Sequence, residues 1–214
     1  MSRRALIGIY GGTFDPVHLG HVLSADELCQ RLEFDELRLV PCHQPPHRSQ
    51  PSASSQQRLE MVKLAIAGHA RLIVDDCELL REGPSYTVDT LKALRETLGS
   101  DVGLCLIMGS DAFARLDSWY QWEKILSLAH IVVLTRPGEN IPEDCRAHQL
   151  LVEQGIIDPA ALRETAAGKV LLQTLAQHEL SATTIRQALA RQQGSIDGLA
   201  PAVLDYIKMN RLYC

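Results

Sequence analysis

Two histidines near the start of the chain stand three residues apart, in the segment His18-Leu19-Gly20-His21. Once a helix begins there, residues three apart project from the same side, roughly 5 to 6 Å from one another. Gly20 removes a side chain that would shield the pair. The spacing therefore predicts two neighbouring imidazoles at the start of a helix, open to a ligand.

The residues before these histidines favour an anionic ligand. Gly11 and Gly12 are predicted to let the backbone turn sharply and approach a ligand, because neither has a Cβ. Pro16 then fixes φ as the chain bends toward the helix. A helix N-terminus with exposed amides and a favourable dipole suits a polyphosphate, so we expect a nucleotide triphosphate. Two alternatives are histidines that only satisfy local backbone groups and a metal site built from Asp15 and both histidines.

A second polar segment lies toward the other end of the chain and reads LSATTIR from Leu180. Ser181 is predicted to cap a helix, with Arg186 on the second turn of that helix. Taken alone, the segment is explained by an ordinary helix cap and a solvated arginine.

A third polar segment, Gly109-Ser110-Asp111, follows a predicted buried strand. Gly109 lets the backbone approach a ligand, and the Asp111 carboxylate can accept hydrogen bonds from ribose hydroxyls. Capping of the next helix by Ser110 or Asp111 is the alternative.

The elements that must position these residues alternate along the chain. Apolar runs that predict strands lie at 5–10, 36–40, 71–75, 102–109, 130–135 and 169–174. Apolar residues spaced by three and four predict helices between several of these runs. Strands separated by helices pair in parallel through right-handed crossovers, so we expect an α/β fold with a doubly wound parallel sheet. Ligands of such sheets bind beyond the carboxyl ends of the strands, where the polar segments lie.

The length of 214 residues and the 46% hydrophobic content favour one domain spanning residues 1–214. We expect the sheet region to cover about 1–180, with a partly irregular insertion near 139–166. Residues 181–214 are predicted to form a small C-terminal helical section.

Charge and cysteine usage exclude several classes of partner. A net charge of −5 gives no overall cationic field for duplex nucleic acid. No window of about 18 apolar residues without a charge predicts a membrane span. The six cysteines form no CxxC pair, which favours free thiols in a reducing compartment. We therefore expect a cytoplasmic protein without nucleic acid or membrane partners.

The segment GGTFDPVHLGH, residues 11–21, resembles the amino-terminal motif of the nucleotidyltransferase superfamily that uses an HxGH histidine pair. LSATTIR resembles the ISxTxIR motif of the same superfamily, with leucine in place of isoleucine and alanine in place of a second serine. The resemblance implies a Rossmann-like nucleotidyltransferase fold. It implies that ATP is bound by a set of backbone and side-chain groups from Gly11, Gly12, Thr13, Phe14, Gly109, Asp111, Ser181 and Thr183.

Two middle segments resemble motifs of the bacterial nicotinate-nucleotide adenylyltransferases. The segment from Ser85 to Thr90 resembles their SYTxDT motif, and Pro45-Pro46-His47-Arg48 resembles PPHK, with arginine in place of lysine. The two side chains are not interchangeable in geometry, although the charge is retained. The resemblance implies that the acceptor nucleotide contacts Arg48 and Tyr86.

An aromatic cluster follows the fourth predicted strand, in a chain that is only 5% aromatic. The resemblance implies that Trp119 stacks on a nicotinate ring, a contact that contributes roughly 0.5 to 1.5 kcal/mol beyond area burial. It also implies that the backbone N–H groups of Thr87 and Tyr120 bind the pyridine carboxylate. Trp122 is predicted to lie in the core.

Together these segments lead us to expect a transferase that makes nicotinate adenine dinucleotide and pyrophosphate from ATP and nicotinate mononucleotide, in NAD biosynthesis. The resemblance implies that His18 and His21 contact ATP phosphates and that Arg186 stabilises the departing pyrophosphate. Mg²⁺ is expected as the cofactor, held mainly by the triphosphate. The alternatives are a pantetheine-phosphate adenylyltransferase and a nucleotide-sensing module without turnover.

Overall fold

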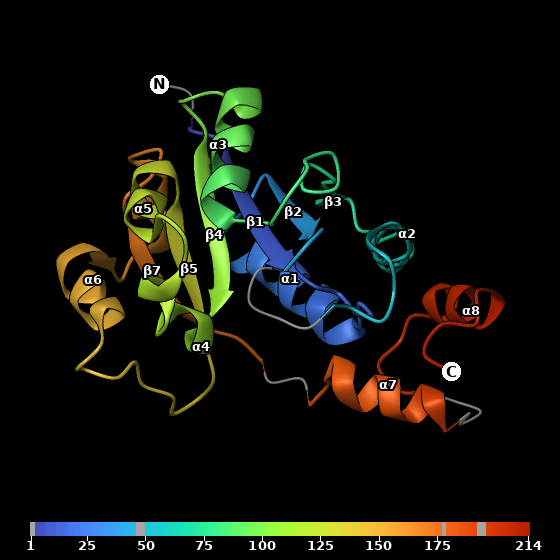
Figure 1. Cartoon of the computed structure of the whole chain (residues 1–214). Coiled ribbons are helices and arrows are strands. Elements are labelled where there is room, and N and C mark those ends of the chain that lie inside the picture. Colours follow the sequence, from blue (N-terminus) through green and yellow to red (C-terminus); the bar gives the residue numbers. More distant parts are fainter. Residues whose placement is uncertain (1–2, 46–49, 177–178, 192–195) are drawn as a thin grey trace.

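In the part of the chain that the structure describes, seven parallel strands form one sheet at the centre of the molecule (Figure 1). The computed structural model describes residues 3–45, 50–176, 179–191 and 196–214. The strand order across the sheet is β3-β2-β1-β4-β5-β7-β6. The strands are β1 (Leu6–Gly12), β2 (Glu36–Pro41), β3 (Leu72–Val74), β4 (Gly103–Gly109), β5 (His130–Thr135), β6 (Gly155–Ile156) and β7 (Val170–Thr174).

Helices cover both faces of the sheet, as expected for a doubly wound fold. The α-helices are α1 (Leu19–Arg31), α2 (Ser55–Ala65), α3 (Thr87–Leu98), α4 (Ser110–Phe113), α5 (Ile125–Leu128), α6 (Arg146–Gln154), α7 (Ala182–Ala190) and α8 (Pro201–Met209). Short 3₁₀ turns are η1 (Leu116–Ser118), η2 (Trp122–Lys124) and η3 (Pro159–Arg163). One face packs against α1, α2, α7 and α8, and the other against α3, α5 and α6.

The apolar strands divide their side chains between these two faces. On β4, Cys105 and Ile107 pack with the α1 side, whereas Leu104 and Leu106 pack with the α3 side. A strand buried on both faces has no polar face, so its sequence is a continuous apolar run. This explains why the sequence shows these strands as continuous apolar runs rather than as an alternation of apolar and polar residues.

The strand order makes the chain reverse direction across the sheet at β1. After β1 the chain builds outward through β2 and β3, and it then returns to place β4 on the other side of β1. The register pairs Ile9 with Leu106 and Tyr10 with Ile107, so both strands end near one another. In open α/β sheets ligands bind in the crevice beyond such a reversal. In Figure 1 these carboxyl ends point toward the lower part of the molecule, where α4 and α7 lie.

The prediction of a doubly wound parallel sheet is confirmed, but the short strand β6 was missed. The segment 139–166, expected to be a partly irregular insertion, contains α6, β6 and η3. β6 extends the sheet by only two residues at its edge, beside β7. A strand of that length carries no periodic signal, which is why the sequence pattern did not reveal it.

The C-terminal helices return to the first loop of the chain. The backbone N–H of Leu19 donates to the Gly198 carbonyl at 2.7 Å, and Ile185 of α7 packs in the same apolar cluster as Val22 of α1. Within the described ranges, no helix is both long enough and apolar enough to cross a membrane.

Removal of a core side chain from β4 tests this two-faced packing. Leu104 is fully buried on β4, and Leu104→Ala is expected to lower the free energy of unfolding by about 2 to 5 kcal/mol. Leu172 on β7 is 40% exposed, so Leu172→Ala is the matched control and is expected to cost about 1 kcal/mol or less. Urea denaturation measures both variants. Equal losses would contradict the assignment of Leu104 to the closed core.

Candidate active site

The loop after β1 differs from the predicted sharp turn at the glycines. Gly11 and Gly12 are the last residues of β1 and pair in extended conformation with Val40 and Pro41 of β2. The chain bends after them, where Phe14 has a φ of 50°. A Cβ at Gly12 would lie 2.8 Å from the buried Phe14 ring, so glycine is needed there for close packing rather than for turning.

The two histidine rings lie side by side, as predicted. Their centroids are 3.8 Å apart, with the ring planes inclined by 30°. His18 is the N-cap of α1, with extended φ and ψ, whereas His21 lies in the first turn. The backbone N–H of His18 donates to Nδ1 of His21 at 3.2 Å. In its neutral form, His21 therefore carries its proton on Nε2 and can donate from that atom.

Burial keeps both imidazoles neutral at pH 7. It lowers the pKa of His18 to about 4 and that of His21 to about 3, and the neighbouring His18 adds to the shift at His21. A bound polyanion would favour the charged forms and so raise both pKa values.

Asp15 joins the first loop to three other parts of the chain. Its carboxylate accepts hydrogen bonds from the backbone N–H of Ser52 at 2.8 Å and of Ala53 at 3.1 Å. The Tyr213 hydroxyl, near the C-terminus, donates to the same carboxylate at 2.7 Å. The Asp15 carbonyl accepts from Nη1 of Arg186 on α7 at 2.6 Å. The two sequence motifs at opposite ends of the chain therefore meet at one residue.

Arg58 is a buried cation beneath these loops that sequence reasoning missed. The side chain is 1% exposed and lies on α2. Its guanidinium donates to the carbonyls of Thr13 at 2.7 Å, Ala53 at 3.2 Å and His43 at 3.4 Å. One side chain thus fixes the backbone of two loops, the one after β1 and the one between β2 and α2. An arginine within an amphipathic helix gives no signal that distinguishes it from a surface charge.

A first cavity, of about 410 Å³, lies over the histidine loop and α7. His21, Thr183 and Arg186 contribute side chains to it, and Ser52 lies on the loop opposite. Arg186 also donates to the Thr183 hydroxyl at 3.3 Å, which holds its guanidinium at the cavity wall. Imidazole, guanidinium and hydroxyl groups make this lining suited to phosphate oxygens.

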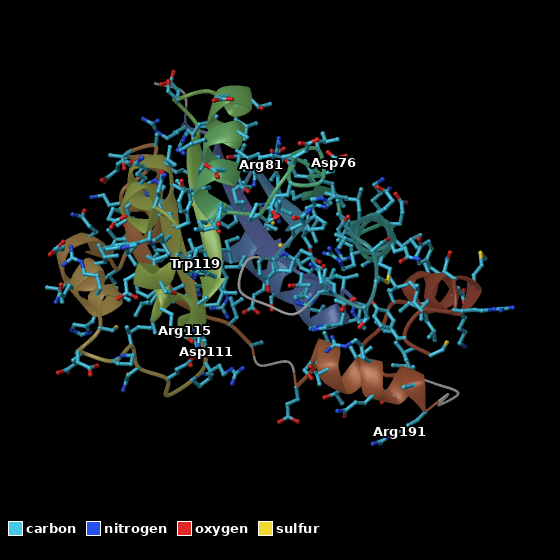
Figure 2. The ribbon with its side chains drawn as sticks, in the orientation of Figure 1. Asp76, Arg81, Asp111, Arg115, Trp119 and Arg191 are labelled. Atoms are coloured by element: carbon cyan, nitrogen blue, oxygen red, sulfur yellow. The ribbon has the colours of Figure 1, made fainter. Side chains whose placement is uncertain are left out.

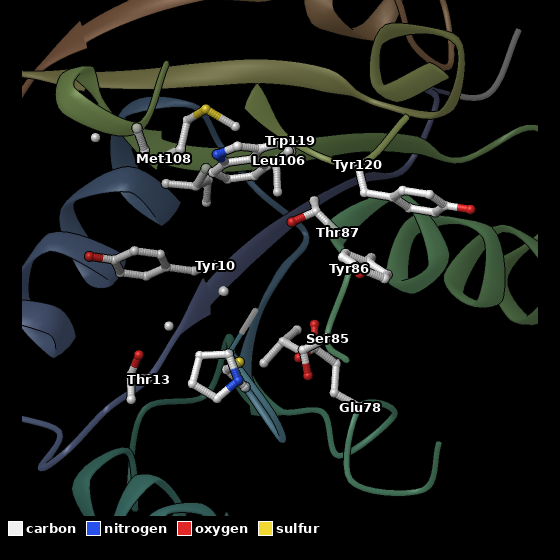
Figure 3. Close-up of a pocket in the computed structure, with 18 of the residues that line it drawn as sticks. Tyr10, Thr13, Glu78, Ser85, Tyr86, Thr87, Leu106, Met108, Trp119 and Tyr120 are labelled. Carbon is white, nitrogen blue, oxygen red and sulfur yellow. The ribbon is translucent and has the colours of Figure 1, made fainter. Parts of the chain in front are cut away.

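A second cavity, of about 690 Å³, lies beyond the ends of β1, β2 and β4. In Figure 3, Thr87, Tyr86 and Tyr120 lie on one side of it, Tyr10 and Thr13 on the other, and Trp119 between them. A volume of several hundred Å³ with mixed aromatic and polar walls is typical of small-molecule sites.

The aromatic wall of this second cavity is built by two segments distant in sequence. The Tyr86 and Tyr120 rings stack with centroids 4.4 Å apart. Within the described residues, neither the Thr87 nor the Tyr120 backbone N–H donates a hydrogen bond to another group of the chain. Both N–H groups are therefore available to an acceptor on a ligand.

Ser85 joins the segment before α3 to the loop after β2. Its hydroxyl accepts from the backbone N–H of His43 at 3.0 Å and of Gln44 at 3.2 Å, and its own N–H donates to the Gln44 carbonyl. The Thr90 hydroxyl donates to the buried Glu78 carboxylate at 2.7 Å. In the segment 85–90, Ser85 and Thr90 thus stabilise the loops, whereas Tyr86 and Thr87 face the second cavity.

Several predicted site residues are not brought into either cavity. Ser181 caps α7 by accepting from the Thr184 N–H and lies outside both linings, so its proposed triphosphate contact stays a prediction. Asp111 is exposed on α4 and lies outside both linings, whereas Arg115, one turn later, lines the second cavity (Figure 2). His18 lies behind His21, and Arg48 lies outside the described residues.

Other predicted site residues line the two cavities. Gly11, Gly12 and Thr13 line both cavities, Phe14 lines the first and Gly109 the second. Trp122 is half-buried against the α3-side core, with the Arg146 guanidinium carbon 5.8 Å from its ring centroid. Tyr10, Glu78 and Arg115 were missed, because an aromatic residue in a strand or a charge in a loop has many structural explanations.

The histidine pair predicts a pH dependence of stability. The folded pKa values lie below the usual 6.5, so the unfolded chain binds more protons between about pH 6.5 and pH 4, and stability falls as the pH falls. Each imidazole contributes a slope of up to about 1.4 kcal/mol per pH unit. The double variant His18→Gln/His21→Gln is expected to lose less stability than the wild type between pH 6.5 and 4.5, measured by urea denaturation.

Measurements at pH 8, where both imidazoles are neutral in both states, provide the control for altered packing in that variant. Parallel stability curves for the two proteins across the acidic range would show that these imidazoles do not titrate as the burial indicates.

Comparisons with known proteins agree with this geometry. Residues 9–188 match the cytidylyltransferase-like family. A Cellvibrio japonicus protein named "Probable nicotinate-nucleotide adenylyltransferase" is 44% identical over 98% of this chain and 99% of its own. A Pseudomonas syringae protein of the same name is 46% identical over 97% of this chain and 93% of its own.

A solved structure of similar fold is the Plasmodium falciparum nicotinic acid mononucleotide adenylyltransferase complexed with NaAD. It has a TM-score of 0.70 at 21% identity and covers 98% of both chains. The sequence similarity over nearly the whole length places this chain in the cytidylyltransferase-like family and, within it, among the nicotinate-nucleotide adenylyltransferases.

Proposed function

We propose that the protein transfers the adenylyl group of ATP to nicotinate mononucleotide, giving nicotinate adenine dinucleotide and pyrophosphate. The observation that carries this proposal is the pair of cavities that meet at the end of β1, one with phosphate-binding groups and one with an aromatic wall. The relatives at 44% to 46% identity carry the name of this activity.

The first cavity is proposed to hold the triphosphate of ATP. His21 would donate from Nε2, because its Nδ1 is occupied by the His18 backbone N–H. Arg186 is held at the wall by Asp15 and Thr183, and its guanidinium would neutralise the departing pyrophosphate. His18 stacks against His21 and would support its orientation.

Mg²⁺ is proposed to arrive with the triphosphate. Among the described residues lining the first cavity, the carboxylate is that of Asp15, and both of its oxygens already accept hydrogen bonds from the chain. The lining therefore fits a triphosphate that carries its own cation. When bound, Mg²⁺ supplies further neutralisation of phosphate charge.

The second cavity is proposed to hold nicotinate mononucleotide. The Trp119 indole offers a flat face for the pyridine ring. The N–H groups of Thr87 and Tyr120 would bind the pyridine carboxylate, and charge-assisted hydrogen bonds of this kind favour the acid over the amide. Stacking on Tyr86 keeps Tyr120, and with it one of the two N–H groups, in place.

The chemistry requires alignment rather than an activated protein nucleophile. A phosphate oxygen of nicotinate mononucleotide attacks the α-phosphorus of ATP, and the bond from that phosphorus to the bridging oxygen of pyrophosphate breaks. No proton must be removed, because the attacking phosphate oxygen is already anionic. The protein's contribution is to hold the two phosphates together at the junction of the cavities and to stabilise charge on the leaving group.

A comparison of acceptors tests the proposal. Pyrophosphate release from ATP is measured with nicotinate mononucleotide, nicotinamide mononucleotide or phosphopantetheine as acceptor. Nicotinate mononucleotide is expected to react fastest, because only its carboxylate satisfies both N–H groups. Equal rates with the acid and the amide would overturn the carboxylate contact. Ligand-induced stabilisation without pyrophosphate from any acceptor would indicate a sensing module instead.

A pair of substitutions separates the two halves of the site. His21→Ala is expected to lower kcat about 10²- to 10³-fold, because it removes a preorganised donor to the phosphates. Trp119→Ala is expected to raise the KM for nicotinate mononucleotide about tenfold, because it removes the stacking face. Steady-state kinetics with both substrates varied measure these effects. If both variants change kcat and the KM for nicotinate mononucleotide in the same way, the division of roles between His21 and Trp119 is wrong.

A further inference from the structure

Tyr10, the third-last residue of β1, lies on the wall that the two cavities share. The described residues that line both cavities form one continuous segment, Tyr10-Gly11-Gly12-Thr13. Gly11 and Gly12 have no side chain, so hydrogen bonds from side chains at this junction come from Tyr10 and Thr13. Thr13 belongs to the motif that the sequence already assigned to ATP.

The Tyr10 ring is held in a fixed position. It meets the Phe14 ring edge to face, with centroids 6.1 Å apart and planes inclined by 87°. Its centroid lies 6.3 Å from that of the His21 imidazole. Figure 3 shows its hydroxyl directed away from Tyr86 and Thr87, the side proposed for the pyridine ring. The hydroxyl therefore belongs to the phosphate side of the junction.

Packing alone does not explain the Tyr10 hydroxyl. Phenylalanine would make the same ring contacts with Phe14 and His21, and the ring packs against the apolar core on the α1 side. In the described part of the chain, no group forms a hydrogen bond with this hydroxyl. Tyr10 lines both cavities, so its hydroxyl is free to bond a ligand there.

The hydroxyl remains a donor beside a phosphate. Burial raises the pKa of Tyr10 to about 12, so the group keeps its proton at neutral pH. A neutral O–H donor can approach an anionic oxygen without repulsion and forms a short, strong hydrogen bond with it.

We propose that the Tyr10 hydroxyl donates a hydrogen bond to a phosphate oxygen at the junction where the acceptor phosphate meets the α-phosphate of ATP. This inference rests on the proposed function and extends it, because it names a group that serves both substrates. The bond aligns the reacting phosphates, so it should matter more to turnover than to binding of either nucleotide alone.

Tyr10→Phe tests the inference, because it deletes the hydroxyl and keeps the ring. We expect kcat to fall about tenfold to hundredfold, the range for loss of one hydrogen bond to a charged group. Binding of nicotinate mononucleotide alone, measured by calorimetry, should change less than about threefold, because the pyridine contacts are intact. Tyr206→Phe on α8 is the matched control, and its kinetics should equal those of the wild type. Thermal midpoints of both variants show whether either substitution disturbs folding.

Two results would overturn the inference. One is a Tyr10→Phe variant with unchanged kcat and KM. The other is a loss confined to nicotinate mononucleotide affinity, which would place the hydroxyl in the pyridine half of the site. Failure of the wild type to release pyrophosphate would instead contradict the proposed function, so the two failures are distinguishable.

Discussion

The hydrogen bonds that converge on Asp15 are the constraint on which the site depends. Its carboxylate is satisfied by two backbone N–H groups and the Tyr213 hydroxyl, and its carbonyl receives Arg186. A carboxylate buried to this degree is stable only when it is fully hydrogen-bonded. Because its partners come from a loop, a helix and the C-terminal segment, satisfying Asp15 places all three around the phosphate side of the site.

Arg58 performs the complementary task from below. Its guanidinium donates hydrogen bonds to backbone carbonyls of these loops. Asp15 thus accepts hydrogen bonds from the loops' N–H groups, and Arg58 donates to their carbonyls. The loops therefore need little regular structure to keep a defined shape. The sheet supplies the rigid base, and these two buried charged residues fix the irregular backbone that rises from it.

Elements with long periodic patterns were predictable from the sequence, and the contacts between distant loops were not. The six apolar runs became strands because both faces of the sheet are covered, whereas the two residues of β6 are too few to form a pattern. The resemblance singled out Tyr86, Thr87, Trp119 and Tyr120, which share one cavity wall. The sequence also predicted that Ser181 caps a helix, and its hydroxyl does cap α7. Arg58 and Tyr10 escaped notice because their roles depend on which loops the fold brings above them.

The two halves of the site are supplied largely by different stretches of the chain, and the described residues that line both cavities lie at and just after the end of β1. The phosphate half comes from the segments around α1 and α7, and the aromatic half from those that follow β3 and β4. Substitutions in the aromatic half can therefore change which acceptor fits without disturbing the groups around the triphosphate. An architecture of this kind allows acceptor preference to diversify during evolution while the nucleotide donor stays the same.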